Sequence, residues 1–228
     1  CALPICFDGT DTSFLFNQAP FVAHIQRMAD WSKSGIFKYG GRQSDAMPLF
    51  YTQECAMVME SSAGFAGIKE NMKGIDIGVS QLPYDDTLVD KPANSIIGGA
   101  SLWVMAGRPD AEYNGVAKFF TYLSSPEVQA DWHQATGYLP VTKAAYALTQ
   151  QQGFYQQNPG ADTAILQMTT SDSTANSKGL RFGNFLQTRE IVDEELEKVW
   201  SGKQSAQAAL DNAVKRGNEQ LRRFERTQ

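Results

Sequence analysis

The 228-residue sequence has few cysteines, no long apolar run and no excess of basic residues, and each of these excludes a class of protein. Three cysteines are too few for a disulfide scaffold, and their positions match no metal-ligand spacing. The longest apolar run, around residues 102–106, is far shorter than the roughly 18 residues that a membrane-spanning helix needs. Because 25 acidic residues outnumber 20 basic ones, the formal net charge of −5 disfavours nucleic acid as a partner.

The N-terminus is atypical. The sequence begins Cys-Ala-Leu-Pro-Ile-Cys, without an initiator Met and without the charged and apolar regions of a signal peptide. We interpret residues 1–6 as an atypical, artefactual segment at a truncated or processed start. A lipidated Cys1 has no upstream lipobox to support it, and Cys1 and Cys6 would pair only if oxidised. The cysteines therefore do not fix the redox compartment.

Apolar residues recur mostly at helical spacing, with short strand-like runs between them. Predicted helices cover residues 17–34, 65–69, 110–123, 126–136, 143–150, 191–200 and 206–224. Predicted strands cover residues 55–60, 75–82 and 101–106. Because helices and strands alternate without an internal repeat or a long linker, the pattern indicates an α/β fold of one domain, or most of one.

The sequence carries none of the common catalytic or nucleotide-binding motifs: no Gly-x-Ser-x-Gly, P-loop or Gly-x-Gly-x-x-Gly string is present. The two histidines, His24 and His133, belong to no metal or nucleophile pattern, so a structural or surface role is favoured for both. The acidic residues within 193–197 are predicted to open a helix, where the dipole favours carboxylates on a solvated face over a metal site. We therefore predict a protein that is not an enzyme and needs no metal or cofactor.

Two glycine- and serine-containing turns suit the binding of a small anion. A turn through Ser61 and Ser62 into a helix would present hydroxyl and backbone N–H groups to a phosphate or carboxylate, and it equally fits simple N-capping. The pair Gly98-Gly99 permits close approach of the backbone to a ligand, and such pairs as often mark a bulge or crossover.

Two arginines are further candidates for anion binding. Arg181 and Arg189 lie in a polar segment before the acidic helix, and a guanidinium binds phosphate with a bidentate fork. Each arginine can instead pair with a nearby acid, Glu190 or Asp193.

Longer strings carry a family resemblance. Ile-Gly-Gly-Ala-Ser-Leu-Trp-Val-Met at 97–105 and Trp-His-Gln-Ala-Thr-Gly-Tyr-Leu-Pro at 132–140 resemble the extracytoplasmic solute-binding proteins of ABC importers, and within them the glycerol-3-phosphate-binding, Ugp-type subfamily. Gly-Tyr-Leu-Pro alone would indicate only the wider family, which includes maltose-type sugar binders. Further similar strings lie, in order, at 153–155, 158–164, 179–181, 191–197 and 221–225.

The resemblance implies a type II periplasmic binding protein fold, an α/β "Venus flytrap" in which the ligand lies between two lobes. It implies that residues 7–228 are the C-terminal part of a protein nearly twice as long, mainly the C-terminal lobe with the N-terminal lobe largely absent. Residues 1–6 depart from the family pattern. Further ligand contacts of the family, an aromatic side chain and a carboxylate, are expected on the absent lobe.

Carried over residue by residue, the family's ligand contacts fall on Ser62, Gly99, Tyr138 and Arg189. Arg189 would bind the phosphate, and Ser62 would offer its hydroxyl with the N–H groups of the helix end. Gly99 would offer a backbone N–H, while Tyr138 would offer a phenolic hydrogen bond and an apolar ring against the glycerol carbons. Ser61 is an alternative to its neighbour.

The function implied is that of the substrate-binding component of an ABC importer for sn-glycerol-3-phosphate and glycerophosphodiesters such as glycerophosphocholine. Such a protein is a periplasmic monomer whose partners are its ligand and the membrane permease subunits, with domain closure as the signal. An oligosaccharide binder of the same family is the nearest alternative, favoured if Arg189 is remote from the cleft. A glycerophosphodiester hydrolase is an alternative from a different class.

Overall fold

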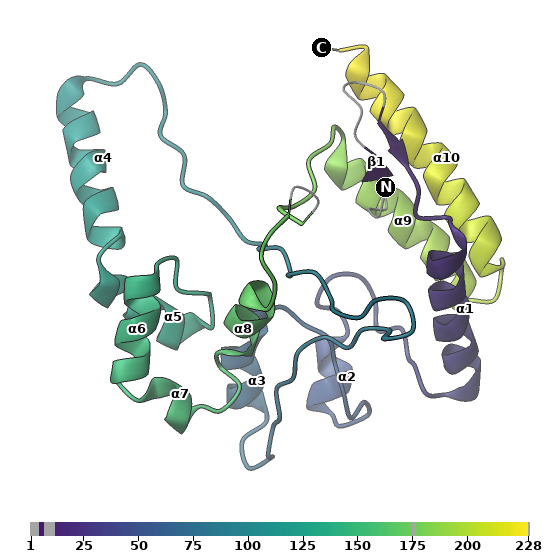
Figure 1. The fold of residues 1–228 in the computed structure, drawn as a ribbon, viewed down its shortest axis with the longest axis horizontal. Helices are drawn as coiled ribbons and strands as arrows, with labels where there is room; N and C mark the ends of the chain where they lie inside the picture. The colour runs from purple at the N-terminus through teal and green to yellow at the C-terminus, as the bar shows by residue number, and fades with distance from the viewer. Residues whose placement is uncertain (1–4, 7–11, 175–176, 228) are drawn as a thin grey trace. The chain divides into compact units, whose positions relative to one another are not determined.

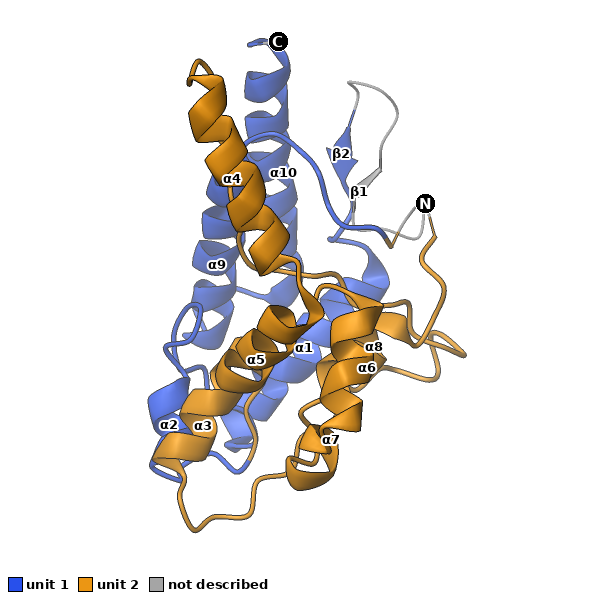
Figure 2. Cartoon of the chain, turned by 90° about the vertical axis from the view of Figure 1, so that its left-hand side faces the viewer, with its two compact units in different colours: residues 1–56, 178–228 blue, residues 57–177 orange. Residues whose placement is uncertain are grey.

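The computed structural model describes residues 5–6, 12–174 and 177–227. The chain forms two compact units (Figure 2). Unit 1 comprises residues 1–56 and 178–228, and unit 2 comprises residues 57–177. The chain therefore leaves unit 1 once and returns to it once.

Unit 1 is built around its two C-terminal helices, α9 (Phe185–Trp200) and α10 (Ala206–Glu225), which lie side by side in Figure 1. Its helices are α1 (Ala19–Ser34), α2 (Met47–Tyr51), α9 (Phe185–Trp200) and α10 (Ala206–Glu225), and its strands are β1 (Ile5–Cys6) and β2 (Ser13–Phe14). The strands pair antiparallel. Small residues let the helices approach closely, because Ala206, Ala209 and Ala213 on α10 are almost fully buried. Phe14 of β2 adds to this core beside Leu221.

A buried carboxylate ties α9 to α10. The side chain of Glu195 is only 3% exposed, and it accepts hydrogen bonds from Lys198 Nζ at 2.7 Å and Arg216 Nη1 at 2.7 Å. Its second oxygen accepts one from Gln204 Nε2 at 2.8 Å. Arg216 also pairs with Glu194 at 2.6 Å. A buried charge of this kind is tolerated because it is both paired and hydrogen-bonded.

The prediction for the acidic run was wrong in two respects. The helix α9 begins at Phe185, so residues 193–197 lie past its middle and Arg189 lies inside the helix. The solvated-face interpretation also fails for Glu195, which is buried. Both errors have one cause: the buried stripe of α9 includes two polar residues, Thr188 and Glu195, so the apolar periodicity is interrupted.

We expect Glu195 to make the stability of unit 1 depend on pH. Burial alone would raise its pKa, but the hydrogen bonds from Lys198, Gln204 and Arg216 outweigh burial and lower the pKa from 4.5 to about 2. The carboxylate therefore stabilises the fold above about pH 4.5, and its contribution is lost as the pH falls toward 2. Glu195→Gln should reduce the free energy of unfolding at pH 7 by about 2 kcal/mol, because an amide has no negative charge to pair with Lys198 and Arg216 and only one acceptor oxygen.

Urea unfolding at several pH values checks this expectation. The decline in stability below pH 4.5 should be shallower in Glu195→Gln than in the unmodified chain. Glu190→Gln is the matched control, since Glu190 is an exposed glutamate on the same helix. Equal effects of the two substitutions would show that the buried network does not stabilise the fold.

Unit 2 contains the remaining helices: the 3-10 turn η1 (Ser62–Gly64), α3 (Phe65–Asn71), α4 (Asp110–Leu123), α5 (Pro126–Thr136), α6 (Lys143–Gln151), α7 (Phe154–Gln157) and α8 (Thr163–Thr169). Helix α5 packs against α6 through two fully buried alanines, Ala130 and Ala145. The predicted caps are present: the Ser125 hydroxyl accepts from the backbone of Val128, and Gly137 ends α5 in the left-handed conformation. All seven predicted helices are thus confirmed across the two units.

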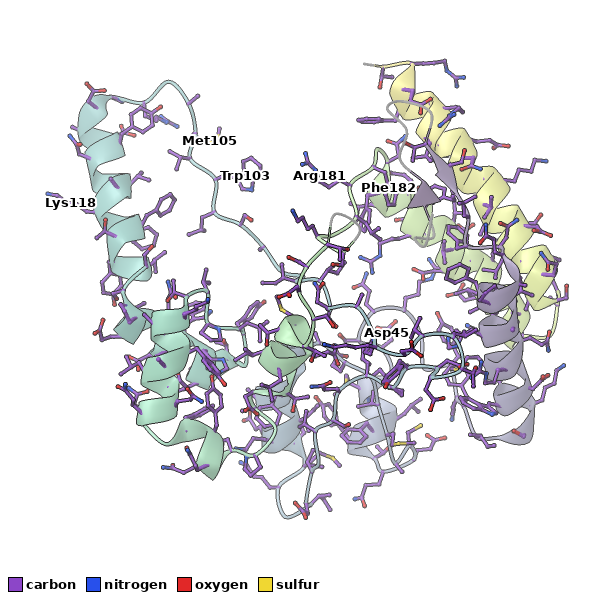
Figure 3. All side chains as sticks on the ribbon, viewed as in Figure 1. Asp45, Trp103, Met105, Lys118, Arg181 and Phe182 are labelled. Atoms are coloured by element: carbon purple, nitrogen blue, oxygen red, sulfur yellow. The ribbon has the colours of Figure 1, made fainter. Side chains whose placement is uncertain are left out.

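The predictions of strands at residues 55–60, 75–82 and 101–106 were wrong. These segments are extended or irregular, and within the described part of the chain no strand pairs with any of them. Some of their backbone groups bond to side chains instead: the N–H of Leu82 donates to Gln167 Oε1 at 2.6 Å. In Figure 3, Trp103 and Met105 project from the third segment, and they are 88% and 69% exposed. The apolar alternation is present, but a strand also requires a neighbouring strand.

The interpretation of the N-terminal cysteines falls mostly outside the described residues. Cys1 is among those not described, and of Cys6 only the backbone in β1 is described. Cys55 is a free, half-buried thiol. None of the helices in the described ranges combines the length and apolarity that crossing a bilayer would take.

Candidate ligand-binding site

The two hydroxyl groups in the turn at Ser61 and Ser62 differ in their hydrogen bonding. Ser61 is the N-cap of η1, and its hydroxyl accepts a hydrogen bond from the Ala63 backbone at 3.3 Å. The half-buried Ser62 forms no side-chain hydrogen bond among the described residues. N-capping therefore explains Ser61, while the Ser62 hydroxyl stays available to a ligand. The predicted strand before this turn is absent.

A left-handed glycine brings the end of α5 against this turn. Gly137 has φ +77°, and a Cβ there would lie 2.5 Å from the backbone oxygen of Ser62. No L-residue with a side chain fits without moving the backbone of one segment. Tyr138, the next residue, is therefore held close to Ser62.

The Tyr138 side chain is 48% exposed, and its hydroxyl has no hydrogen-bond partner among the described residues. Its ring is beside Gly99, where a Cβ would lie 3.9 Å from Tyr138 Cε1. Gly99 is exposed and has φ +112°, a conformation that favours glycine and leaves its backbone open. Three of the four predicted residues, Ser62, Gly99 and Tyr138, thus gather at one place in unit 2.

The fourth predicted residue, Arg189, belongs to unit 1. It is an exposed residue of α9, and its guanidinium carbon lies 5.9 Å from the ring centroid of Phe185. The alternative pairing with Glu190 or Asp193 does not occur, because neither Arg181 nor Arg189 forms an ion pair with any residue that the structure describes. Both cations are therefore available to an anion.

The sequence did not indicate which buried side chains hydrogen-bond near Tyr138. His133 is 2% exposed, and its Nδ1 lies 2.5 Å from the Tyr138 carbonyl oxygen while its Nε2 lies 3.0 Å from the Tyr155 hydroxyl. Burial lowers the pKa of His133, against the opposing effect of the carbonyl contact. Burial, with the neighbouring Tyr146 and Asp162, raises the pKa of Tyr155. Of the structural or surface role favoured for His133, its burial agrees with the structural one, but its partners could be seen only in the fold.

The four predicted residues were compared with the apolar groove and with the possible metal ligands of the described residues. An apolar groove of about 320 Å³ runs between the extended segment 102–105 and α4, and none of the four predicted residues lines it. Over the described ranges, no three His, Cys, Asp or Glu side chains are grouped so that they could hold a metal ion.

Comparison with known families decides the class of protein. The sequence profile of the family described as "Bacterial extracellular solute-binding protein" matches residues 5–163, which is more than half of the chain. The chain belongs to this family. A solved structure, the cyclic alpha-maltosyl-1,6-maltose binding protein from Arthrobacter globiformis, matches with a TM-score of 0.68 over 94% of this chain and 51% of its own. At 22% identity this likeness concerns the fold alone, and it confirms the predicted type II fold.

Among solute-binding proteins, this chain is similar to those of one subfamily. It is 53% identical over 221 residues to the sn-glycerol-3-phosphate-binding periplasmic protein UgpB of Escherichia coli strain K12, and equally to that of Pectobacterium atrosepticum. Each alignment covers 97% of this chain and 50% of the relative. The predicted resemblance is confirmed, and the chain spans about half the length of the curated relatives it matches.

Proposed function

We propose that this chain is part of the substrate-binding protein of an ABC importer that takes up sn-glycerol-3-phosphate and glycerophosphodiesters such as glycerophosphocholine. The observation that carries the proposal is the 53% identity, over 97% of the chain, to proteins named for binding sn-glycerol-3-phosphate. The protein acts as a periplasmic monomer, binds without catalysis and delivers its ligand to membrane permease subunits. Residues 7–228 form the C-terminal part of that protein.

The proposal assigns ligand contacts to Ser62, Gly99, Tyr138 and Arg189. The gathering of the first three in unit 2 supports it, because their hydroxyls and the open glycine backbone offer neutral hydrogen bonds to a polyol or phosphate ester. Arg189 supplies the positive charge that a phosphate dianion needs, and its guanidinium is not neutralised by an acid among the described residues.

Isothermal titration calorimetry tests the proposal. The ligands are sn-glycerol-3-phosphate, glycerophosphocholine and maltose, and the proteins are this chain and a form extended to the full length of its relatives. We expect the full-length form to bind the phosphate esters and not maltose. Binding of maltose alone would move the assignment to the sugar-binding branch of the family. Turnover of glycerophosphocholine, followed by phosphorus NMR, would instead support a hydrolase.

The two free hydroxyls give a prediction with a small expected effect on stability. Ser62→Ala and Tyr138→Phe each remove one hydroxyl that has no partner among the described residues, so unfolding should change little. Affinity of the full-length protein for sn-glycerol-3-phosphate should fall about 3- to 10-fold for each. Ser61→Ala is the control in calorimetry, since it removes the cap of η1 and should affect stability more than affinity.

A further inference from the structure

The buried side chain of His133 hydrogen-bonds to the backbone carbonyl of Tyr138. A carbonyl oxygen only accepts hydrogen bonds, so the contact from His133 Nδ1 at 2.5 Å requires the proton on Nδ1. In the neutral ring, Nε2 then carries a lone pair, and the Tyr155 hydroxyl at 3.0 Å donates to it. The two contacts together select one tautomer and one orientation of the ring.

The surroundings of the imidazole keep it in this arrangement. The rings of Phe154 and Tyr155 pack against His133, with centroids 5.8 Å and 5.7 Å away. Tyr146 of α6 packs in turn on Tyr155, at 5.4 Å. The histidine on α5 is therefore fixed by side chains from α6 and α7, and it is only 2% exposed.

Apart from the contact with His133, the backbone of Tyr138 forms one side-chain hydrogen bond among the described residues. The Tyr138 N–H donates to Thr136 Oγ1 at 3.2 Å, but this hydrogen bond is exposed and Thr136 is only half-buried. Among the described residues, His133 is the one buried side chain that hydrogen-bonds to the Tyr138 backbone. Without it, the carbonyl of the half-exposed Tyr138 would lose its buried hydrogen-bond donor, and the ring would be held less firmly beside Gly99.

We propose that His133, oriented by Tyr155, is a positioning residue for ligand binding: its Nδ1–H fixes the Tyr138 carbonyl and so keeps the Tyr138 ring beside Gly99. This inference rests on the proposed function. His133 itself does not contact the ligand, because its side chain is buried and both ring nitrogens are already engaged, by Tyr138 and by Tyr155. It acts through the geometry of one hydrogen bond.

Two substitutions of His133 separate positioning from general packing. In His133→Asn the amide nitrogen takes the place of Nδ1 and keeps the donor to Tyr138, while the contact with Tyr155 is lost. In His133→Gln the amide oxygen takes the place of Nε2 and keeps the acceptor for Tyr155, while the donor to Tyr138 is lost. Gln134→Ala is the control, since it removes an α5 contact with Gln152 and none with Tyr138.

Two measurements are made on these variants. Hydrogen exchange of the amides of Gly137, Tyr138 and Leu139 is followed in the ligand-free chain, and affinity for sn-glycerol-3-phosphate is measured in the full-length form. We expect His133→Gln to speed exchange and weaken affinity, each about 3- to 10-fold, and His133→Asn to restore both to within about twofold. Loss of stability alone would affect both variants alike.

The outcomes distinguish the inference from the proposed function. If the unmodified full-length protein does not bind sn-glycerol-3-phosphate, the proposed function fails, and exchange in the ligand-free chain still tests whether His133 holds Tyr138. If it binds and the two variants behave alike in exchange and affinity, the positioning role is overturned. An effect of Gln134→Ala as large as that of His133→Gln would overturn it as well.

Discussion

Replacing Gly137 by alanine is expected to weaken the binding of sn-glycerol-3-phosphate by the full-length protein about 100-fold, through loss of two ligand hydrogen bonds. The added Cβ would lie 2.5 Å from the Ser62 backbone oxygen, so either the Ser62 turn or the Tyr138 segment must move. Both segments carry proposed contacts, and a shift separates one hydroxyl from the other. The left-handed φ of +77° adds about 1–2 kcal/mol of backbone strain for alanine.

The control for this effect is Gly35→Ala. Gly35 ends α1 with φ +78°, nearly the same conformation, but a Cβ there would meet nothing within 4 Å. Gly35→Ala therefore carries the same strain without the steric contact, and we expect a smaller shift of thermal unfolding than in Gly137→Ala, with affinity kept. If calorimetry shows equal affinity loss for both variants, strain and not the contact with Ser62 is responsible, and the placement of the site is wrong.

The helices could be predicted because their signals are local. Ser125 and Gly137 mark the two ends of α5 by their own chemistry, and apolar spacing marks its length. The start of α9 could not be predicted this way, since Asn184, in a left-handed conformation, precedes it and Thr188 occupies a buried position. A polar residue becomes buried through contacts with another element, which the sequence of one helix does not contain.

The strands could not be predicted from local signals. Residues 75–82 alternate like a strand, but a strand exists only when a partner accepts and donates its backbone hydrogen bonds. The candidate site likewise combines residues that local signals predict with a contact that only the fold reveals. Ser62, Gly99 and Tyr138 were named from turn chemistry and family resemblance, whereas the contact of Gly137 with Ser62 joins segments 75 residues apart in sequence and appears only in the fold.

We expect Arg189→Ala to weaken the binding of sn-glycerol-3-phosphate by the full-length protein about 100-fold or more, and Arg189→Lys about 10-fold. Alanine removes both the charge and the bidentate fork, whereas lysine keeps a point charge. Stability should change little, because the guanidinium is exposed, stacks only on Phe185 and has no ion-pair partner among the described residues. Calorimetry with sn-glycerol-3-phosphate and urea unfolding check the two expectations separately.

Arg181→Ala is the matched control, since Arg181 is also an exposed arginine of unit 1 without an ion pair to any described residue. A specific phosphate contact makes Arg189→Ala far more harmful than Arg181→Ala at every salt concentration, whereas diffuse attraction makes both equally mild and fades as salt rises. If Arg189→Ala binds sn-glycerol-3-phosphate with unchanged affinity, Arg189 is not part of the binding site. The phosphate would then be bound by other groups, and the assignment of Arg189 as its contact would be wrong.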